Sequence, residues 1–135
     1  MPFVNAGEKR ILINVLAAGP EREQLLSALA ADAACPISRL GPMLQLEMGQ
    51  LGPFMIRLRV HAFSQGEGPI LAMERVHQLK DADAIILAGA GAEAIRRDLA
   101  VAGRADLTEV VWKSGEPSAA AARAVLKPVL TRLTG

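Results

Sequence analysis

The sequence predicts an α/β fold in three layers, with helices on both faces of a mostly parallel sheet of about five strands. Two observations support this prediction. The chain opens with a strand, a turn and a helix, which is the usual first unit of a parallel sheet. Farther on, only about five residues join two strand-like segments, whereas a parallel crossover needs roughly a dozen or more. These two segments are therefore predicted to pair as an antiparallel hairpin.

The first unit is visible in the pattern of apolar residues. Residues 10–18 form a continuous apolar run that ends at Gly19 and Pro20, which predicts a buried strand. A helix is predicted from Arg22, with acidic residues in its first turn, where they suit the positive end of the helix dipole. Its apolar residues recur at helical spacing: Leu25, Leu26, Leu29, Ala30 and Ala33.

The predicted hairpin consists of residues 43–48 and 54–63, which alternate apolar and polar side chains. Pro69 then suits the first position of a helix. The apolar residues of that helix are expected to form its buried stripe: Ala72, Met73, Val76 and Leu79.

The second half of the chain alternates short strands with helices. Residues 84–88 and 109–112 are predicted strands, and residues 93–101 are a predicted helix between them. Residues 117–133 form the last predicted helix. Pro128 has no N–H to donate to the carbonyl of the fourth residue before it, so this helix is expected to kink or break near Lys127.

Composition limits the classes of partner and location. Fifteen Lys and Arg residues against 14 Asp and Glu give a formal net charge of +1, and the basic residues are scattered, which argues against a nucleic-acid partner. A single cysteine and the lack of a charged-then-apolar leader favour the reducing cytoplasm. No apolar run is long enough to span a membrane. We therefore expect one cytoplasmic domain over residues 1–135, without a membrane span.

The predicted hairpin distinguishes between two α/β families of this length. Receiver-type domains have wholly parallel sheets, whereas Ras-like GTPases pair an antiparallel second strand with the third, so the hairpin favours the Ras-like fold. The segment Phe3-Val4-Asn5, followed by a strand that runs into Gly19-Pro20, resembles the start of bacterial Ras-like GTPases of the mutual gliding protein A (MglA) type, which set cell polarity. Residues 79–84 resemble that family's passage into the fourth strand. The resemblance implies a Ras-like sheet that is truncated relative to a full small GTPase, because the family continues with a sixth strand and a further helix.

The resemblance also implies a phosphate-binding loop after Gly19, but the chemical groups of that loop are absent. In the pattern G-x-x-x-x-G-K-[ST], glycine amides hold the phosphates, the lysine reaches the β- and γ-phosphates, and the hydroxyl binds magnesium. With Gly19 as the first glycine, these last three positions fall on Gln24, Leu25 and Leu26. Two leucines can neither neutralise a triphosphate nor hold a metal, so no nucleotide, metal or other cofactor is expected.

The family's other nucleotide-contacting segments are degenerate as well. Its water-positioning glutamine would correspond to Gln65, which has nothing to position without a phosphate. Its guanine-reading Asn-Lys-x-Asp would fall on residues 112–115, where Trp112 and Gly115 replace the asparagine and the aspartate and only Lys113 remains. These losses predict a pseudo-GTPase that is not an enzyme.

By resemblance, such a domain would bind a protein in a bacterial polarity, motility or regulatory complex. The partners implied are a Roadblock-type regulator, which binds the family's switch face, or an active small GTPase. The switch region corresponds to residues 63–69, and the second strand of the fold often lies near a sheet edge, where exposed apolar residues invite pairing. The candidate interface residues are Leu44, Leu46, Met48, Leu51, Phe63, Gln65 and Glu67.

Two alternatives remain open at this point. A diverged enzyme or small-ligand-binding protein would use the crevice at the carboxyl ends of the strands, and a crevice filled by Leu25 and Trp112 would argue against it. Its candidate polar residues are Gln24, Gln65, Lys113 and Ser114. A pseudo-receiver used as a docking module would need a helix in place of the hairpin.

Overall fold

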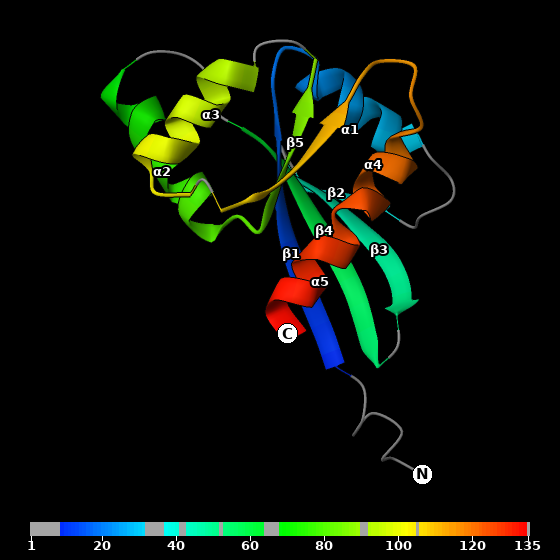
Figure 1. Ribbon diagram of the computed structural model, residues 1–135. Helices are drawn as coiled ribbons and strands as arrows, with labels where there is room; N and C mark the ends of the chain where they lie inside the picture. The colour runs from blue at the N-terminus through cyan, green and yellow to red at the C-terminus, as the bar shows by residue number, and fades with distance from the viewer. Residues whose placement is uncertain are drawn as a thin grey trace.

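A computed structural model describes residues 9–31, 37–40, 43–51, 53–63, 68–89, 92–104 and 106–134. Helices α2 and α3 lie on one side of the sheet, and α1, α4 and α5 lie on the other (Figure 1). The elements are, in chain order, β1 (Lys9–Ala18), α1 (Arg22–Ala31), β2 (Ile37–Leu40), β3 (Met43–Leu51), β4 (Phe54–Ala62), α2 (Pro69–Asp81), β5 (Ala84–Ala88), α3 (Ala92–Val101), β6 (Thr108–Trp112), α4 (Ser118–Ala124) and α5 (Leu126–Thr134).

The sheet has the strand order β2-β3-β4-β1-β5-β6. Strand β1 pairs in parallel with β4 and β5, and β5 pairs in parallel with β6. Strand β3 runs antiparallel to β4 and to β2. The predicted fold is therefore confirmed: a three-layer, mostly parallel sheet with the Ras-like antiparallel hairpin, here β3–β4. A wholly parallel receiver-type sheet is excluded, because the chain between β3 and β4 is a tight connection and not a helix.

The sheet has six strands where about five were expected, because β2 is added at its edge. Four residues are too few for an alternating pattern to be visible in the sequence, and these four form a strand by pairing with β3. Ile37 lies opposite Leu46, and Leu40 lies opposite Met43. As a result β3 is an inner strand of the sheet and not its edge.

Each face of the sheet has its own apolar core, as the alternation of side chains along a strand requires. On one face, Ile13 of β1 packs with Leu25 and Leu29 of α1 and with Val125 and Val129 near the C-terminus. The other core is smaller. It comprises Leu16, Ala18, Phe63, Leu79, Ala82, Ile85, Leu87, Leu99 and Leu107. In the described part of the chain, no helix has the length and apolar content needed to cross a membrane.

Helix α2 is turned differently from the prediction. Of the predicted buried stripe only Leu79 is buried, while Met73 and Val76 are 62% and 57% exposed. The half-buried side of α2 instead includes Gln78, whose Nε2 donates to the carbonyl oxygen of Ala62 at 3.0 Å. Helix α2 is held against the sheet at its own carboxyl end, by this polar contact and by the packing of Leu79. The apolar residues nearer the start of the helix therefore face solvent.

The last predicted helix consists of two helices, α4 and α5, separated at Val125. The break lies three residues before Pro128, which occupies the first turn of α5. The N–H groups in a first turn have no partner within their own helix, so a proline costs little there. The expected interruption is confirmed, and it lies slightly earlier than Lys127.

Candidate functional site

The turn between β1 and α1, where the resemblance implies a phosphate loop, packs directly on the end of β5. Gly19 has φ +104°, and a Cβ atom at this position would overlap the carbonyl oxygen of Ala88. The same carbonyl accepts a hydrogen bond from the N–H of Glu21 at 3.0 Å. Glycine is therefore required here by the close approach of two backbone segments as well as by its φ value.

The Glu21 side chain joins this turn to the loop after β6. Its Oε1 accepts a hydrogen bond from the backbone N–H of Ser114 at 3.1 Å. Its Oε2 lies beside Gly89, since a Cβ atom built on that glycine would be 2.9 Å from it. The carboxylate thus lies among the chain segments that follow β1, β5 and β6. These are the carboxyl ends of parallel strands, where ligands of open α/β sheets usually bind.

The loop after β6 is also closed on itself by hydrogen bonds. The indole Nε1 of Trp112 donates to the carbonyl oxygen of Glu116 at 3.1 Å, and the N–H of Lys113 donates to the Glu116 carboxylate at 3.0 Å. The N–H of Gly89 donates to the carbonyl oxygen of Trp112 at 3.2 Å. Trp112 is buried in the same core as Leu25, so its indole packs in the protein interior.

The electrostatics of the turn do not suit a phosphate. A phosphate brought close to Glu21 would meet a negative charge, and two unit charges 4 Å apart repel by roughly 1–4 kcal/mol, depending on their exposure to water. The Ser114 N–H is already used by Glu21. Arg22 supplies a cation at this turn, but its Nη1 donates to the carbonyl oxygen of Gly19 at 3.2 Å. Its buried Nε makes no hydrogen bond with the described residues.

The predicted positions of the degenerate nucleotide site occupy very different environments. Leu25 and Leu26 are buried in the core, as their helical spacing indicated. Gln24 and Lys113 are exposed, and Gly115 lies in the exposed loop with φ +96°. Of the polar set expected for a small-ligand site, Gln65 lies outside the described residues. Gln24, Lys113 and Ser114 line none of three hollows found among the described residues.

Three of the predicted interface residues require correction. Leu44, Leu46 and Phe63 are buried in the two cores, so their side chains are not available to a partner. For Leu44 and Leu46 the reason is that β2 covers the edge of β3 and that their face of the sheet carries the larger core. Met48 is half-buried against that core. Gln65 and Glu67 lie outside the described residues, as does the side chain of Leu51.

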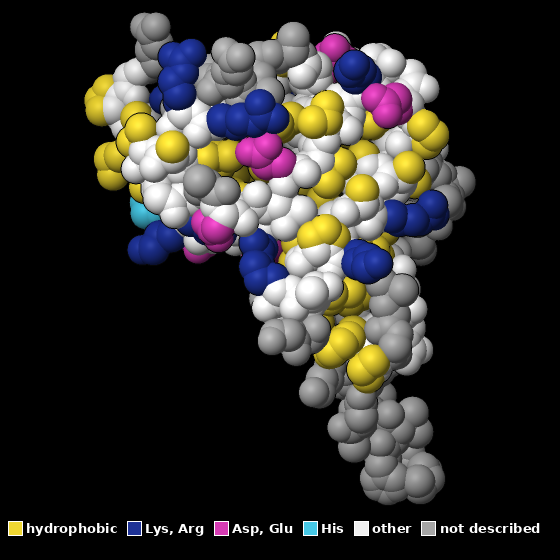
Figure 2. Space-filling model, viewed as in Figure 1, with side chains coloured by type: hydrophobic (Ala, Val, Ile, Leu, Met, Phe, Trp, Pro, Cys, Tyr) yellow, Lys and Arg dark blue, Asp and Glu magenta, His cyan; other side chains and the backbone are white. Residues whose placement is uncertain are grey.

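An exposed apolar surface is found instead on α2. Ile70, Met73 and Val76, which we call the α2 stripe, are 80%, 62% and 57% exposed. Ala72, Met73, Val76 and His77 line a shallow hollow of about 250 Å³ on this helix. In the space-filling view, hydrophobic side chains are visible on the side of the molecule formed by α2 and α3, and others lie over the side of α4 and α5 (Figure 2). The sequence predicts Met73 and Val76 on the buried side of this helix, and it gives no such prediction for Ile70.

Comparison with known proteins adds little to these observations. No family model matches the chain, and no curated protein matches it. Among solved structures, the chain is similar to the cytosolic domain of the T. maritima FeoB iron transporter in its apo form, with 16% sequence identity and a TM-score of 0.38. The match covers 90% of this chain and 62% of that one, so this chain spans less than two-thirds of that structure's length. The fold is defined here by the strand order and pairing.

Proposed function

We propose that this chain is a nucleotide-free, non-catalytic Ras-like domain that binds a protein partner in a bacterial polarity, motility or regulatory complex. The observation that supports it most directly is the Glu21 carboxylate bound to the Ser114 N–H. A side chain of the protein itself, negatively charged as a phosphate is, lies at the carboxyl ends of the strands. The leucines at positions 25 and 26, both buried, support the same conclusion, because they supply neither a cation nor a metal ligand.

The α2 stripe supports the binding role. Exposing large apolar side chains to water is unfavourable in free energy. Burying one such side chain, Ile70, Met73 or Val76, against a partner stabilises the complex by roughly 1.5–3 kcal/mol. Helix α2 directly follows the segment that corresponds, by resemblance, to the switch region of Ras-like GTPases. A Roadblock-type regulator or an active small GTPase is the partner that this resemblance suggests.

Calorimetric titration of the full chain with GTP and with GDP, each in the presence of magnesium, tests the absence of nucleotide binding. We expect no heat of specific binding. An active small GTPase titrated under the same conditions is the positive control. Micromolar binding of either nucleotide would contradict the proposal.

Affinity purification from native cells tests the partner surface. We expect Met73→Glu in the tagged full chain to release the partner that the wild-type chain retains, because the new carboxylate would be buried at the interface. The matched control is Val101→Glu, which places the same charge at a 90% exposed apolar position on α3. If both variants lose the partner equally, or if neither variant loses it, the α2 stripe is not the docking surface.

A further inference from the structure

A second surface adjoins the α2 stripe and has a different chemistry. The half of the sheet formed by the early part of β1 and the neighbouring parts of β4 and β3 extends beyond α2 and α3 (Figure 1). Its exposed side carries a hollow of about 250 Å³ lined by Arg10, Leu12, Glu47, Met55, Arg57 and Arg59, together with Ile11 and Ile56. We call this surface the open sheet face.

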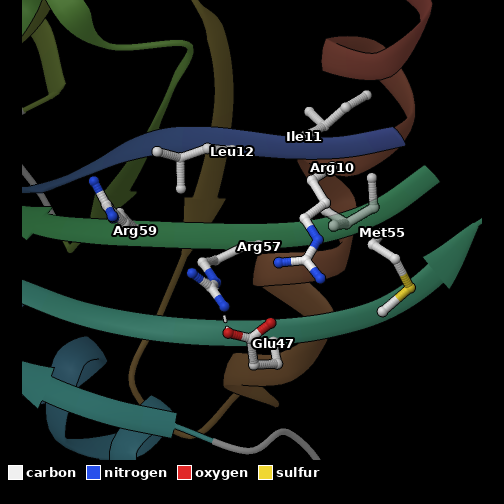
Figure 3. Close-up of a pocket in the computed structure, with 8 residues that line it drawn as sticks. Arg10, Ile11, Leu12, Glu47, Met55, Arg57 and Arg59 are labelled. Atoms are coloured by element: carbon white, nitrogen blue, oxygen red, sulfur yellow. Dashed lines mark hydrogen bonds and ion pairs between the residues drawn. The ribbon is translucent and has the colours of Figure 1, made fainter. Parts of the chain in front are cut away.

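Cations dominate the open sheet face (Figure 3). Glu47 binds only one of the three arginines, through a 2.6 Å ion pair with the Nε of Arg57. The Nε of Arg59 has a neutral partner, the Oε1 of Gln45, at 3.4 Å. The side chain of Arg10 is exposed and makes no hydrogen bond or ion pair with the side chain of a described residue. Among the described residues, neither Arg10 nor Arg59 forms an ion pair on this surface, which also includes Leu12, 39% exposed.

The open sheet face continues into the α2 stripe. Arg59 lines both the first hollow and a second one of about 480 Å³, which lies between the sheet and α2 and includes His61 and Asp81. His77 in turn lines this second hollow and the apolar hollow on α2. One surface thus runs from exposed apolar side chains at α2, through the half-buried Arg59, to the arginines on the sheet.

The chemistry of this surface selects among possible occupants. Single-stranded nucleic acids are usually bound by basic surfaces with aromatic side chains on which bases stack, and no Phe, Tyr or Trp lines any of the three hollows. Binding to anionic membranes usually relies on a larger excess of basic residues than the net charge of +1 provides. A compact anion would share its hollow with the Glu47 carboxylate. A segment with spaced acidic residues and some apolar ones matches the separated arginines, Leu12 and the α2 stripe together.

We propose that the partner docks through an acidic segment that also carries apolar side chains, with its carboxylates on Arg10 and Arg59 and its apolar residues on Leu12 and the α2 stripe. This inference rests on the proposed function and specifies the chemistry of the partner. Arg57 is already neutralised by Glu47 and contributes less.

Selection from a display library of short random peptides on the immobilised full chain tests this inference. We expect the selected peptides to be enriched in Asp and Glu alongside apolar residues. Their affinity should fall by about tenfold or more in the double variant Arg10→Glu/Arg59→Glu and should decrease with added salt. The matched control is Arg123→Glu/Lys127→Glu, two exposed positions on α4 and α5, and it should bind as the wild type does. Unchanged melting temperatures show that both variants fold.

Several results would overturn the inference. One is that the selected peptides show no enrichment in Asp and Glu. Another is that the Arg10→Glu/Arg59→Glu variant binds them as well as the wild type does. A third is that no peptide is selected at all. Arginine-dependent binding of phosphatidylglycerol vesicles or of oligo(U) RNA, measured in parallel without an acidic peptide being selected, would overturn it as well. Loss of peptide binding in Met73→Glu but not in Arg10→Glu/Arg59→Glu would leave the proposed function standing while the acidic-segment inference fails.

Discussion

The carboxylate of Glu21 accepts a hydrogen bond from the backbone N–H of Ser114, and 93 residues separate the two in the sequence. The bond joins the first turn of the fold, between β1 and α1, to the loop between β6 and α4. It places a negative charge at the start of α1, where the helix dipole favours it. One side chain thus joins two loops at the carboxyl ends of the strands and places a negative charge there.

Replacement of Glu21 by Ala should lower the free energy of unfolding by about 1 kcal/mol, because a partly exposed, charge-assisted hydrogen bond is lost. Urea denaturation measures this loss. The control is Glu23→Ala, which removes an exposed carboxylate from the same helical turn. Removing the charge should not create GTP binding, because Leu25 and Leu26 still supply no cation or metal ligand. An equal loss of stability in the two variants would show that the Ser114 bond contributes nothing.

Replacement of Gly19 by Ala should destabilise the fold by roughly 2–4 kcal/mol, because it combines a strained φ with overlap on the Ala88 carbonyl. Gly115→Ala is the matched comparison. That glycine also has a positive φ, but a Cβ atom there would have no described atom within 4 Å, so about 1–2 kcal/mol is expected. Thermal and urea denaturation give both values. Similar losses in the two variants would mean that the turn can shift away from β5.

Arg104 holds the carboxyl end of α2 and should be important for stability. Its guanidinium donates to the carbonyl oxygens of Leu79, Lys80 and Ala82 at 2.7, 3.0 and 2.9 Å. Arg104→Ala should cost roughly 2–3 kcal/mol, since bonds from a charged donor to several carbonyls are lost together. Arg104→Lys should restore only part of this, because an ammonium lacks the planar fork.

The control for Arg104 is Arg97→Ala, at an exposed position on α3. Hydrogen exchange of the amides in α2 gives a second measurement, because loosening of its carboxyl end should increase exchange there first. Unchanged hydrogen exchange in α2 of the Arg104→Ala variant would show that Arg104 does not hold the carboxyl end of this helix in place.

His61 should make stability depend on pH. Burial, and secondarily the positive charge of Arg59, hold the pKa of His61 below its ordinary value of 6.5. The unfolded chain therefore binds a proton more readily than the folded one, so stability is full above about pH 6.5 and decreases as the pH falls from there to the folded-state pKa. Urea denaturation from pH 8 to pH 5 should show this decrease, and His61→Gln should reduce it.

The cause of the His61 shift is tested by Arg59→Gln. Removing the neighbouring cation should move the pKa of His61 part of the way back toward 6.5, as measured by NMR titration of the imidazole protons. A pKa that does not rise in Arg59→Gln would leave burial as the sole cause.

Most of the fold was predictable because it follows from chain length and long patterns. The short connection between residues 48 and 54 allows only an antiparallel pair, and β3–β4 is that pair. Strand β2 was not predictable, because a four-residue strand exists only through its pairing with β3. The orientation of α2 was wrongly predicted from apolar spacing. Its polar Gln78 satisfies the carbonyl of Ala62 on the inner side, a tertiary contact that spacing along one helix does not reveal.

For the candidate site, the sequence alone reveals only which groups of a phosphate-binding loop are missing. The missing lysine and hydroxyl are visible at Leu25 and Leu26, and both leucines are core residues. Glu21 gave no signal of its own, because its partner lies 93 residues away and an acidic residue in a first helical turn is common. Arg57 and Arg59 alternate along one predicted strand, whereas Arg10 lies far from them in the sequence, and the pairing of β1 with β4 brings it to the same surface.

The close approach of Gly19 to the end of β5 affects how relatives of this chain should be compared. Because a larger residue would collide with the Ala88 backbone, selection for stability alone would preserve this glycine whether or not the turn binds a phosphate. In an alignment, a glycine in this column would therefore not be diagnostic of nucleotide binding. The columns of Leu25 and Leu26 would be more informative, because the lysine and the hydroxyl residue of a phosphate-binding loop would stand there.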